Sequence, residues 1–298
     1  MPAAERALDW ARDGPHWPLR ENSRFVEAAG VRWHVQVSGQ GPVVLLLHGT
    51  GASVHSWRGL AQCLAEHFTL VAPDLPGHGF TSRVASGPPS LPNIGRALTG
   101  LLAHLQLRPE MAIGHSAGAA IAVQLAMHEG AALRGIVGIN AALLPFPAVQ
   151  GALFRPAARL LAATPIVSRL FARRAADRGA VERLVASTGS VLAPAGIDLY
   201  ARLMADPGHV AGALAMMAHW DLAALARCLP QLRVPLLLLA GTDDRTVAPR
   251  QAARVARLAP QARVVELPGL GHLAHEEQPQ EVAALCRQFA RDSGVGDR

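Results

Sequence analysis

The sequence predicts an α/β fold built on a mostly parallel, eight-stranded sheet with helices on both faces. Short apolar runs of strand length alternate with longer helical patterns through most of the 298 residues, which is typical of βαβ units. Most of these runs are unbroken, as expected of strands that are covered on both faces. Half of the residues are hydrophobic, enough to fill a sizeable core.

The expected strands begin with a hairpin and continue as single apolar runs. Residues 24–39 alternate at period two around Gly30, so we expect an antiparallel hairpin at one edge of the sheet. The further strands are expected at 43–49, 68–74, 111–116, 133–140, 234–241 and 262–269. Helices are expected between them at about 56–66, 92–106, 117–129, 249–258 and 279–291.

A long helical insertion interrupts this alternation. Residues 143–229 show helical patterning broken by prolines, with no strand-like run, and they are far too many for an ordinary connection. Because the insertion follows the sixth strand, we expect it to form a cap over the crevice where open α/β sheets bind ligands. The predicted organisation is an N-terminal extension (1–22), a core in two parts (23–142 and 230–298) and this cap.

The composition excludes several classes of function. All 28 basic side chains are arginine, and the lack of lysine excludes Schiff-base and pyridoxal chemistry. The arginines are spread from Arg6 to Arg298 without a nucleic-acid motif, so the net charge of +6 does not indicate nucleic-acid binding. Cys63, Cys228 and Cys286 are too widely spaced for a disulfide framework or a structural zinc site.

Two further features bear on localisation and on metals. No apolar run reaches the ~20 residues of a membrane-spanning helix, and the N-terminus lacks the apolar segment of a secretory signal. We therefore expect a cytoplasmic protein. His272 and His275 are three residues apart, but metal sites usually need a third ligand and a fixed helix face, so neither a metal nor another cofactor is expected.

The stretch Gly114–Gly118 carries the strongest catalytic signal. It reads Gly-His-Ser-Ala-Gly, fits the pattern G-x-S-x-G, and lies between an apolar strand and a helix of small residues. Glycine suits both ends of a sharp strand-to-helix turn, where a Cβ would collide with neighbouring backbone. Such a turn lifts the Ser116 hydroxyl above the sheet and aims the Ala117 N–H at a developing oxyanion. The sequence therefore predicts a serine nucleophile.

A serine nucleophile needs a base and an acid that orients the base. We expect His272, which follows the last strand, to be the base. The acid is expected in the loop after 234–241, where Asp244 lies where such loops turn inward; Asp243 stays open as the alternative. The other place for the acid, the end of the preceding strand, holds Asn140, and an amide cannot stabilise an imidazolium as a carboxylate does.

These residues follow one another as Ser116, Asp244 and His272, the chain order of the α/β-hydrolases. Residues 24–292 resemble this family throughout. The resemblance implies acyl transfer to water, in which the histidine takes and returns the serine proton and the aspartate holds the imidazole tautomer. Serine at this position argues against haloalkane dehalogenase or epoxide hydrolase chemistry, which in similar folds uses a carboxylate nucleophile.

Two other segments carry the same resemblance. Residues 45–53 (LLLHGTGAS) are similar to the HG oxyanion loop of the family, and residues 74–82 (DLPGHGFTS) resemble its D-x-x-G-x-G-x-S turn. The first segment implies that the Thr50 backbone N–H is a second oxyanion donor beside that of Ala117, with Gly51 close by.

The substrate pocket is expected to be apolar. His115 precedes the nucleophile and is expected at the pocket floor, while Met217 and Trp220 offer deformable, polarizable lining where the cap returns to the core. In the cap, residues 154–171 are expected to pack internally and the arginines of 168–184 to be solvated. Contact of these segments with lipid or with an anionic ligand stays open.

A narrower resemblance runs along nearly the full length of the chain. Three segments resemble the BchO-type magnesium-chelatase accessory hydrolases of bacteriochlorophyll biosynthesis in photosynthetic bacteria: residues 10–26 (with Trp10, Trp17, Pro18, Arg20 and Ser23), 32–36 and 216–222. The resemblance implies tetrapyrrole metabolism, an apolar small-molecule substrate whose propionates arginines would receive, and association with magnesium chelatase. Two functions stay open: a serine hydrolase acting on a hydrophobic, tetrapyrrole substrate, and a non-catalytic tetrapyrrole-binding accessory protein.

Overall fold

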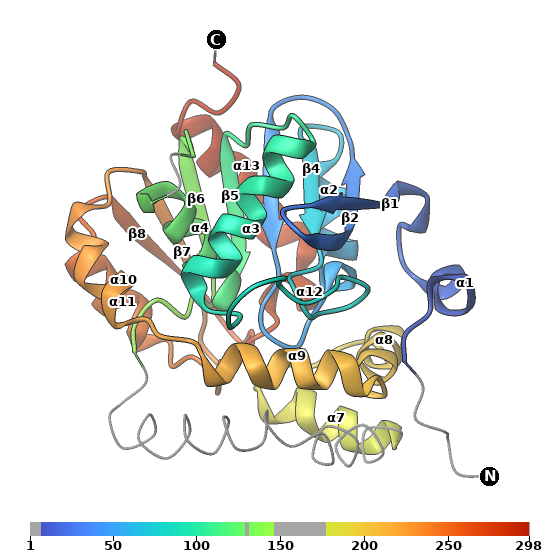
Figure 1. Ribbon diagram of the computed structural model, residues 1–298. Helices are drawn as coiled ribbons and strands as arrows, with labels where there is room; N and C mark the ends of the chain where they lie inside the picture. The colour runs from blue at the N-terminus through green and yellow to red at the C-terminus, as the bar shows by residue number, and fades with distance from the viewer. Residues whose placement is uncertain (1–6, 129–130, 146–176, 298) are drawn as a thin grey trace.

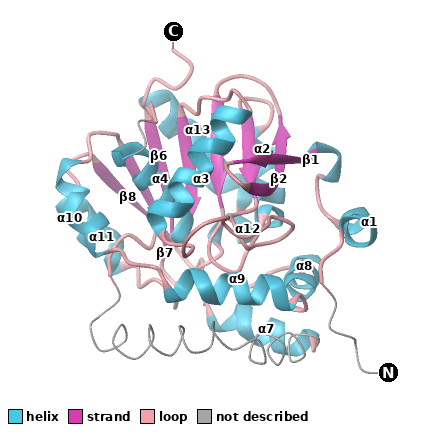
Figure 2. Cartoon of the chain, viewed as in Figure 1, coloured by secondary structure: helices cyan, strands magenta, loops and turns pink. Residues whose placement is uncertain are grey.

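An eight-stranded sheet forms the centre of the molecule, with helices on both faces (Figures 1 and 2). The computed structural model describes residues 7–128, 131–145 and 177–297. The strands are β1 (Ser23–Ala28), β2 (Val31–Ser38), β3 (Val43–Leu47), β4 (Thr69–Pro73), β5 (Met111–His115), β6 (Gly135–Ile139), β7 (Leu236–Gly241) and β8 (Ala262–Leu267). All of the strands expected from the sequence are present.

The strand order is β1-β2-β4-β3-β5-β6-β7-β8, with the predicted hairpin at one edge. β2 pairs antiparallel with β1 and with β4, and the other neighbours pair parallel. The carboxyl ends of β3 to β8 therefore lie along the same edge of the sheet. The α/β fold with a mostly parallel sheet, predicted from the sequence, is confirmed.

Each face of the sheet has its own apolar core, which explains the unbroken apolar runs. Leu45 and Leu47 of β3 belong to one buried cluster, whereas Val44 and Leu46 belong to the other. This is the alternation that a strand covered on both faces requires. Helices α3 (Leu91–His104), α4 (Ala117–His128) and α11 (Arg250–Leu258) cover the first face, and α2 (Arg58–Leu64) and α13 (Pro279–Asp292) cover the second.

Between β6 and β7 the described residues form helices and no strand. These helices are α7 (Arg178–Ser187), α8 (Pro194–Met204), α9 (Pro207–Ala218) and α10 (Ala223–Cys228). Figure 1 shows α7, α8 and α9 grouped below the sheet, while α10 packs on the core helix α4. Residues 154–171 and the first part of 168–184 lie outside the described residues. The division into core and cap therefore stays a prediction.

Two prolines that break the helical pattern of the insertion begin helices instead. Pro194 and Pro207 are the first residues of α8 and α9, where the missing N–H costs nothing. Helix α9 then meets the turn after β4 backbone to backbone. A Cβ added to Gly212 would lie 1.9 Å from the carbonyl oxygen of Gly77, so a helix residue with a side chain does not fit at this contact.

The N-terminal extension packs closely on the core. It contains the short helix α1 (Trp10–Asp13) and a buried Trp17 that joins the core cluster of the second face. Trp10 meets Phe25 and Phe80 edge-on, with ring centres 5.4 and 5.0 Å apart. Among the helices of the described segments, none is long and apolar enough to cross a membrane.

Candidate active site

Ser116 is the single residue between β5 and α4. Its φ of 51° places it in the left-handed region, which costs a residue with a side chain ~1–2 kcal/mol. Backbone hydrogen bonds hold it there: its N–H donates to Ile139 O at 2.9 Å, and its carbonyl accepts from the N–H groups of Ala119 and Ala142, both at 3.2 Å. Strain maintained in this way is typical of functional positions.

The glycines on either side of Ser116 are required by close backbone packing. A Cβ on Gly118 would lie 1.9 Å from the Leu47 carbonyl oxygen, and a Cβ on Gly114 would lie 2.4 Å from the Ala119 nitrogen. The helix that follows the serine therefore begins directly against the end of β3. This is the steric reason for the G-x-S-x-G pattern at this turn.

The predicted acid and base are hydrogen-bonded to each other. His272 Nδ1 lies 2.8 Å from Asp244 Oδ2, and both side chains are buried. The other carboxylate oxygen of Asp244 accepts from the N–H groups of Thr246 at 2.7 Å and Val247 at 2.9 Å. An ionised Asp244 makes Nδ1 the protonated nitrogen of His272 and leaves Nε2 free to accept a proton. Asp243 is exposed, and among the described residues its side chain accepts from the neighbouring Thr242 hydroxyl alone.

Asn140 anchors the loop that carries His272. Its side-chain nitrogen donates to the carbonyl oxygens of Gly271 and His272, both at 2.9 Å, and its side-chain oxygen accepts from the N–H of Gly241 at 2.8 Å. The ring nitrogen Nε2 of His115 also donates to the His272 carbonyl, at 2.9 Å. The end of β6 therefore holds a positioning residue for the base.

A row of buried rings, tilted against one another, packs beside His272. The His115 ring lies 4.7 Å from that of His272 and 4.6 Å from that of His275, which in turn lies 4.7 Å from Trp57. Burial, reinforced by the neighbouring histidines, holds the pKa of His115 well below its usual range, so the ring is neutral. His115 is buried among these rings, and its contact with substrate at the pocket floor stays a prediction.

Residues 45–53, which we call the oxyanion loop after the family segment that they resemble, pass directly beside Ser116. A Cβ added to Gly49 would lie 2.7 Å from His115 Nδ1 and 3.2 Å from Ser116 Cβ. Thr50 follows Gly49 directly, and Ala117 is the first residue of α4; their roles as oxyanion donors stay a prediction. Among the described residues no hydrogen bond joins the Ser116 hydroxyl to His272; such contacts often tighten only when substrate binds.

His209 of α9 is a site residue that the sequence did not reveal. Its Nε2 donates to the carbonyl of Gly51 at 3.1 Å, and its Nδ1 accepts from the N–H of Gly79 at 3.1 Å. Burial lowers its pKa to about 4, so the ring is neutral and can serve as donor and acceptor at once. A single imidazole thus joins α9 to both loops that resemble family motifs.

The other predicted pocket residues lie on or just after α9. The Thr50 hydroxyl contacts the sulfur of the buried Met216 at 3.6 Å, so this methionine of α9 reaches the oxyanion loop. Met217 and Trp220 are half-buried, and their contact with substrate stays a prediction.

Asp74, the first residue of the D-x-x-G-x-G turn, has a structural position. It accepts from His34 Nδ1 at 2.7 Å, from the N–H of Val54 at 2.7 Å and from the N–H of Phe80 at 3.0 Å. Burial alone would raise the pKa of Asp74, but His34, His48 and the N–H of Phe80 lower it to about 2. The ionised carboxylate thereby fixes the turn against β2 and the oxyanion loop.

Comparisons with known proteins agree with this geometry. A family model described as the alpha/beta hydrolase fold matches residues 42–279. The chain is 41% identical to the magnesium-chelatase 30 kDa subunit of Rhodobacter capsulatus, over 88% of this chain and 92% of that protein. It is 30% identical to the pimeloyl-[acyl-carrier protein] methyl ester esterase of Xanthomonas oryzae, over 83% and 96%.

A solved structure shows the same fold at lower sequence identity. The esterase of Thermogutta terrifontis superposes with a TM-score of 0.72 at 24% identity, covering 91% of this chain and 98% of that one. The matched range contains the elbow at Ser116, the Asp244–His272 pair and both motif loops. The chain therefore belongs to the α/β-hydrolase family.

Proposed function

We propose that this protein is a serine hydrolase that cleaves an ester or related acyl bond in a hydrophobic substrate. Ser116 is the nucleophile, His272 the general base and acid, and Asp244 the residue that orients the base. The proposal depends above all on the 2.8 Å hydrogen bond between Asp244 and His272. The main chain of His272 is in turn hydrogen-bonded to His115, the residue before Ser116.

The reaction follows from these positions. The Ser116 hydroxyl attacks the substrate carbonyl while His272 Nε2 takes its proton, and Asp244 stabilises the imidazolium through Nδ1–H. The backbone N–H groups of Thr50 and Ala117 donate to the tetrahedral oxyanion, each worth ~2.7–4 kcal/mol. His272 then protonates the leaving group, and water releases the acyl group by the same steps.

For the substrate, we propose a tetrapyrrole ester of bacteriochlorophyll biosynthesis. Support comes from two similarities: the Rhodobacter relative is named as a magnesium-chelatase subunit, and the Xanthomonas relative is named as a methyl ester esterase. A cytoplasmic location, association with magnesium chelatase and a peripheral membrane contact belong to the same proposal.

Labelling with a fluorophosphonate tests the catalytic part of this proposal. The wild-type protein should be labelled, and Ser116→Ala should abolish the label. Ser187→Ala, which removes an exposed serine of α7, is the matched control and should leave the label unchanged. Failure to label the folded wild-type protein, or a label that persists in Ser116→Ala, would refute the serine hydrolase.

A second candidate is a non-catalytic accessory protein that binds a tetrapyrrole for magnesium chelatase. The similarity to the Rhodobacter subunit favours it. Complementation of a Rhodobacter capsulatus strain that lacks this subunit separates the candidates. If catalysis is the biological role, the wild-type gene should restore pigment and Ser116→Ala should not; if binding suffices, both genes should restore it.

A further inference from the structure

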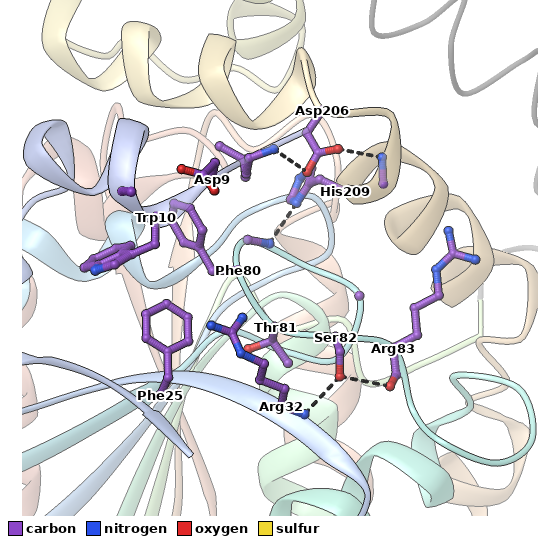
Figure 3. Close-up of a pocket in the computed structure, with 15 residues that line it drawn as sticks. Asp9, Trp10, Phe25, Arg32, Phe80, Thr81, Ser82, Arg83, Asp206 and His209 are labelled. Atoms are coloured by element: carbon purple, nitrogen blue, oxygen red, sulfur yellow. Dashed lines mark hydrogen bonds between the residues drawn. The ribbon is translucent and has the colours of Figure 1, made fainter. Parts of the chain in front are cut away.

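Two parts of the insertion between β6 and β7 are bonded to loops of the core. One is the start of α9, where His209 points toward the turn that carries Phe80 and Thr81 (Figure 3). The other is the turn between α7 and α8, residues 188–191, which we call the α7–α8 turn. The first part also reaches the oxyanion loop, whereas the second reaches the loops of the proposed acid and base.

One carbonyl oxygen of the α7–α8 turn bonds to both of these loops. The Thr188 carbonyl accepts from the N–H of Arg245 at 3.1 Å and from the N–H of His272 at 3.4 Å. Arg245 directly follows Asp244 in the sequence, and His272 is the proposed base. Because a carbonyl oxygen has two lone pairs, this single atom links the main chains that carry the hydrogen-bonded pair of Asp244 and His272.

A buried serine of the turn holds the residue that follows the base. Ser190 is 2% exposed, and its hydroxyl oxygen accepts from the N–H of Leu273 at 2.8 Å. The carbonyl of His272, in contrast, accepts from the side chains of Asn140 and His115. The N–H groups of residues 272 and 273 thus bond to the insertion, while the carbonyl of residue 272 bonds to the core. The insertion and the core fix the main chain of the base together.

The main chain of the turn also packs directly against both loops. Gly189 has a φ of 87°, and a Cβ added to it would lie 1.9 Å from the Asp243 carbonyl oxygen. A Cβ added to Gly271 would lie 2.3 Å from the carbonyl carbon of Gly189. The Glu277 carboxylate adds a further link, since it accepts from the N–H groups of Gly271 at 3.0 Å and Val191 at 3.3 Å. At this packing density a displacement of the turn also displaces the acid and base loops.

We propose that the α7–α8 turn positions the pair of Asp244 and His272 for proton transfer, with Ser190 as a positioning residue for the base. This inference rests on the function proposed above, because it assigns a part of the insertion to the acyl-transfer machinery. A displacement of about 1 Å at a reacting group can cost ~100-fold in rate. A hydrogen bond that fixes the main chain of the base therefore affects catalysis without touching the substrate.

Steady-state hydrolysis of p-nitrophenyl acetate tests the role of Ser190. In Ser190→Ala the N–H of Leu273 loses its acceptor, and kcat and kcat/KM should both fall about tenfold, because the base acts in the transition state. Rates are divided by the amount of protein that fluorophosphonate labels at completion, so a loss of folded protein does not count as a loss of kcat. The matched control is Ser187→Ala, which removes a hydroxyl that donates to Leu184 O within α7 at 2.7 Å, and its kcat should equal that of the wild type.

Proton NMR reads the acid–base pair without catalysis. A proton shared between a histidine and a carboxylate gives a low-field resonance, and the described residues form two such pairs, because His34 Nδ1 also lies 2.7 Å from Asp74 Oδ2. The resonance of His272 is identified by its loss in Asp244→Asn. In Ser190→Ala this resonance should shift or broaden, whereas the resonance of His34 should keep its position. Both resonances should keep their positions in Ser187→Ala.

The outcomes separate this inference from the function on which it rests. If fluorophosphonate does not label the wild type, the serine hydrolase is refuted, and the NMR comparison still decides whether the turn holds the pair. If the wild type is labelled, an unchanged kcat or an unmoved His272 resonance in Ser190→Ala overturns the inference, as does an equal effect in Ser187→Ala.

Circular dichroism establishes that each variant is folded. Should Ser190→Ala fail to fold, Glu277→Ala replaces it, because this change removes the acceptor shared by the N–H groups of Gly271 and Val191. It should shift the same resonance of His272 and leave that of His34 in place. An unmoved His272 resonance in this variant would equally overturn the inference.

Discussion

Replacing Asn140 with glycine should destabilise the protein because one buried amide joins the ends of two loops. Its three hydrogen bonds reach the N–H of Gly241 at the end of β7 and the carbonyls of Gly271 and His272 after β8. The side chain is 4% exposed, so water does not readily replace these partners. Glycine is the informative substitution, since position 140 has a φ of 47° that glycine adopts without strain.

The size of the effect follows from what is left unpaired. Without the amide, the buried N–H of Gly241 has lost its hydrogen-bond acceptor, which lowers the free energy of unfolding by ~1–3 kcal/mol. The two lost hydrogen bonds to Gly271 and His272 lower it by ~1 kcal/mol each. The His272 carbonyl retains the bond from His115, which offsets part of the loss. We expect the free energy of unfolding to fall by about 3 kcal/mol. Asn140→Ala should lose a further ~1–2 kcal/mol, because alanine is strained at this φ.

Urea unfolding followed by circular dichroism measures both variants against the wild type. Hydrolysis of p-nitrophenyl acetate, measured on folded protein, reports whether the His272 loop has moved. The reasoning is wrong if Asn140→Gly unfolds within about 1 kcal/mol of the wild type. It is also wrong if the alanine variant is as stable as the glycine variant.

Three further predictions concern the surrounding structure. The pKa of Asp74 is lowered from 3.8 to about 2 in the folded protein. The ionised carboxylate therefore contributes ~2 kcal/mol to the free energy of unfolding above pH 3.8, and this contribution is lost as the pH falls from 3.8 to about 2. Urea titrations at several pH values should show this loss in the wild type and not in Asp74→Asn. Gly118→Ala should yield little soluble protein, because its Cβ would overlap the Leu47 carbonyl; soluble expression at the wild-type level would contradict this reading. His209→Gln should lower kcat for p-nitrophenyl acetate about tenfold through the displaced Gly51 loop, and steady-state kinetics with unchanged kcat would exclude that role.

The sheet and its order of elements could be predicted because burial on both faces leaves a continuous apolar pattern in each strand. The choice between Asp243 and Asp244 could not be settled in the same way. Two adjacent carboxylates look alike in a sequence, and the N–H groups of Thr246 and Val247 select one of them. That selection depends on loop conformation, which residue types only suggest.

Positioning residues were the hardest to predict. Asn140 and His209 bond to main-chain atoms far away along the chain, and any residue can supply a main-chain atom, so no pattern of side chains marks the pairing. The N-terminal extension was set apart from the core because the hydrolase pattern does not need it. Trp17 nevertheless belongs to the apolar core of the second face, and Trp10 packs against the same core.

The contact between Gly212 and Gly77 fixes the position of α9 relative to the turn after β4. Because the two backbones touch with no side chain between them, close packing opposes translation or rotation of the helix against this turn. If Met217 contacts the substrate as predicted, its flexible thioether would adapt to differences in substrate shape while the backbone of α9 keeps its position. Single substitutions of side chains along α9 would then change substrate selectivity without changing the position of the helix.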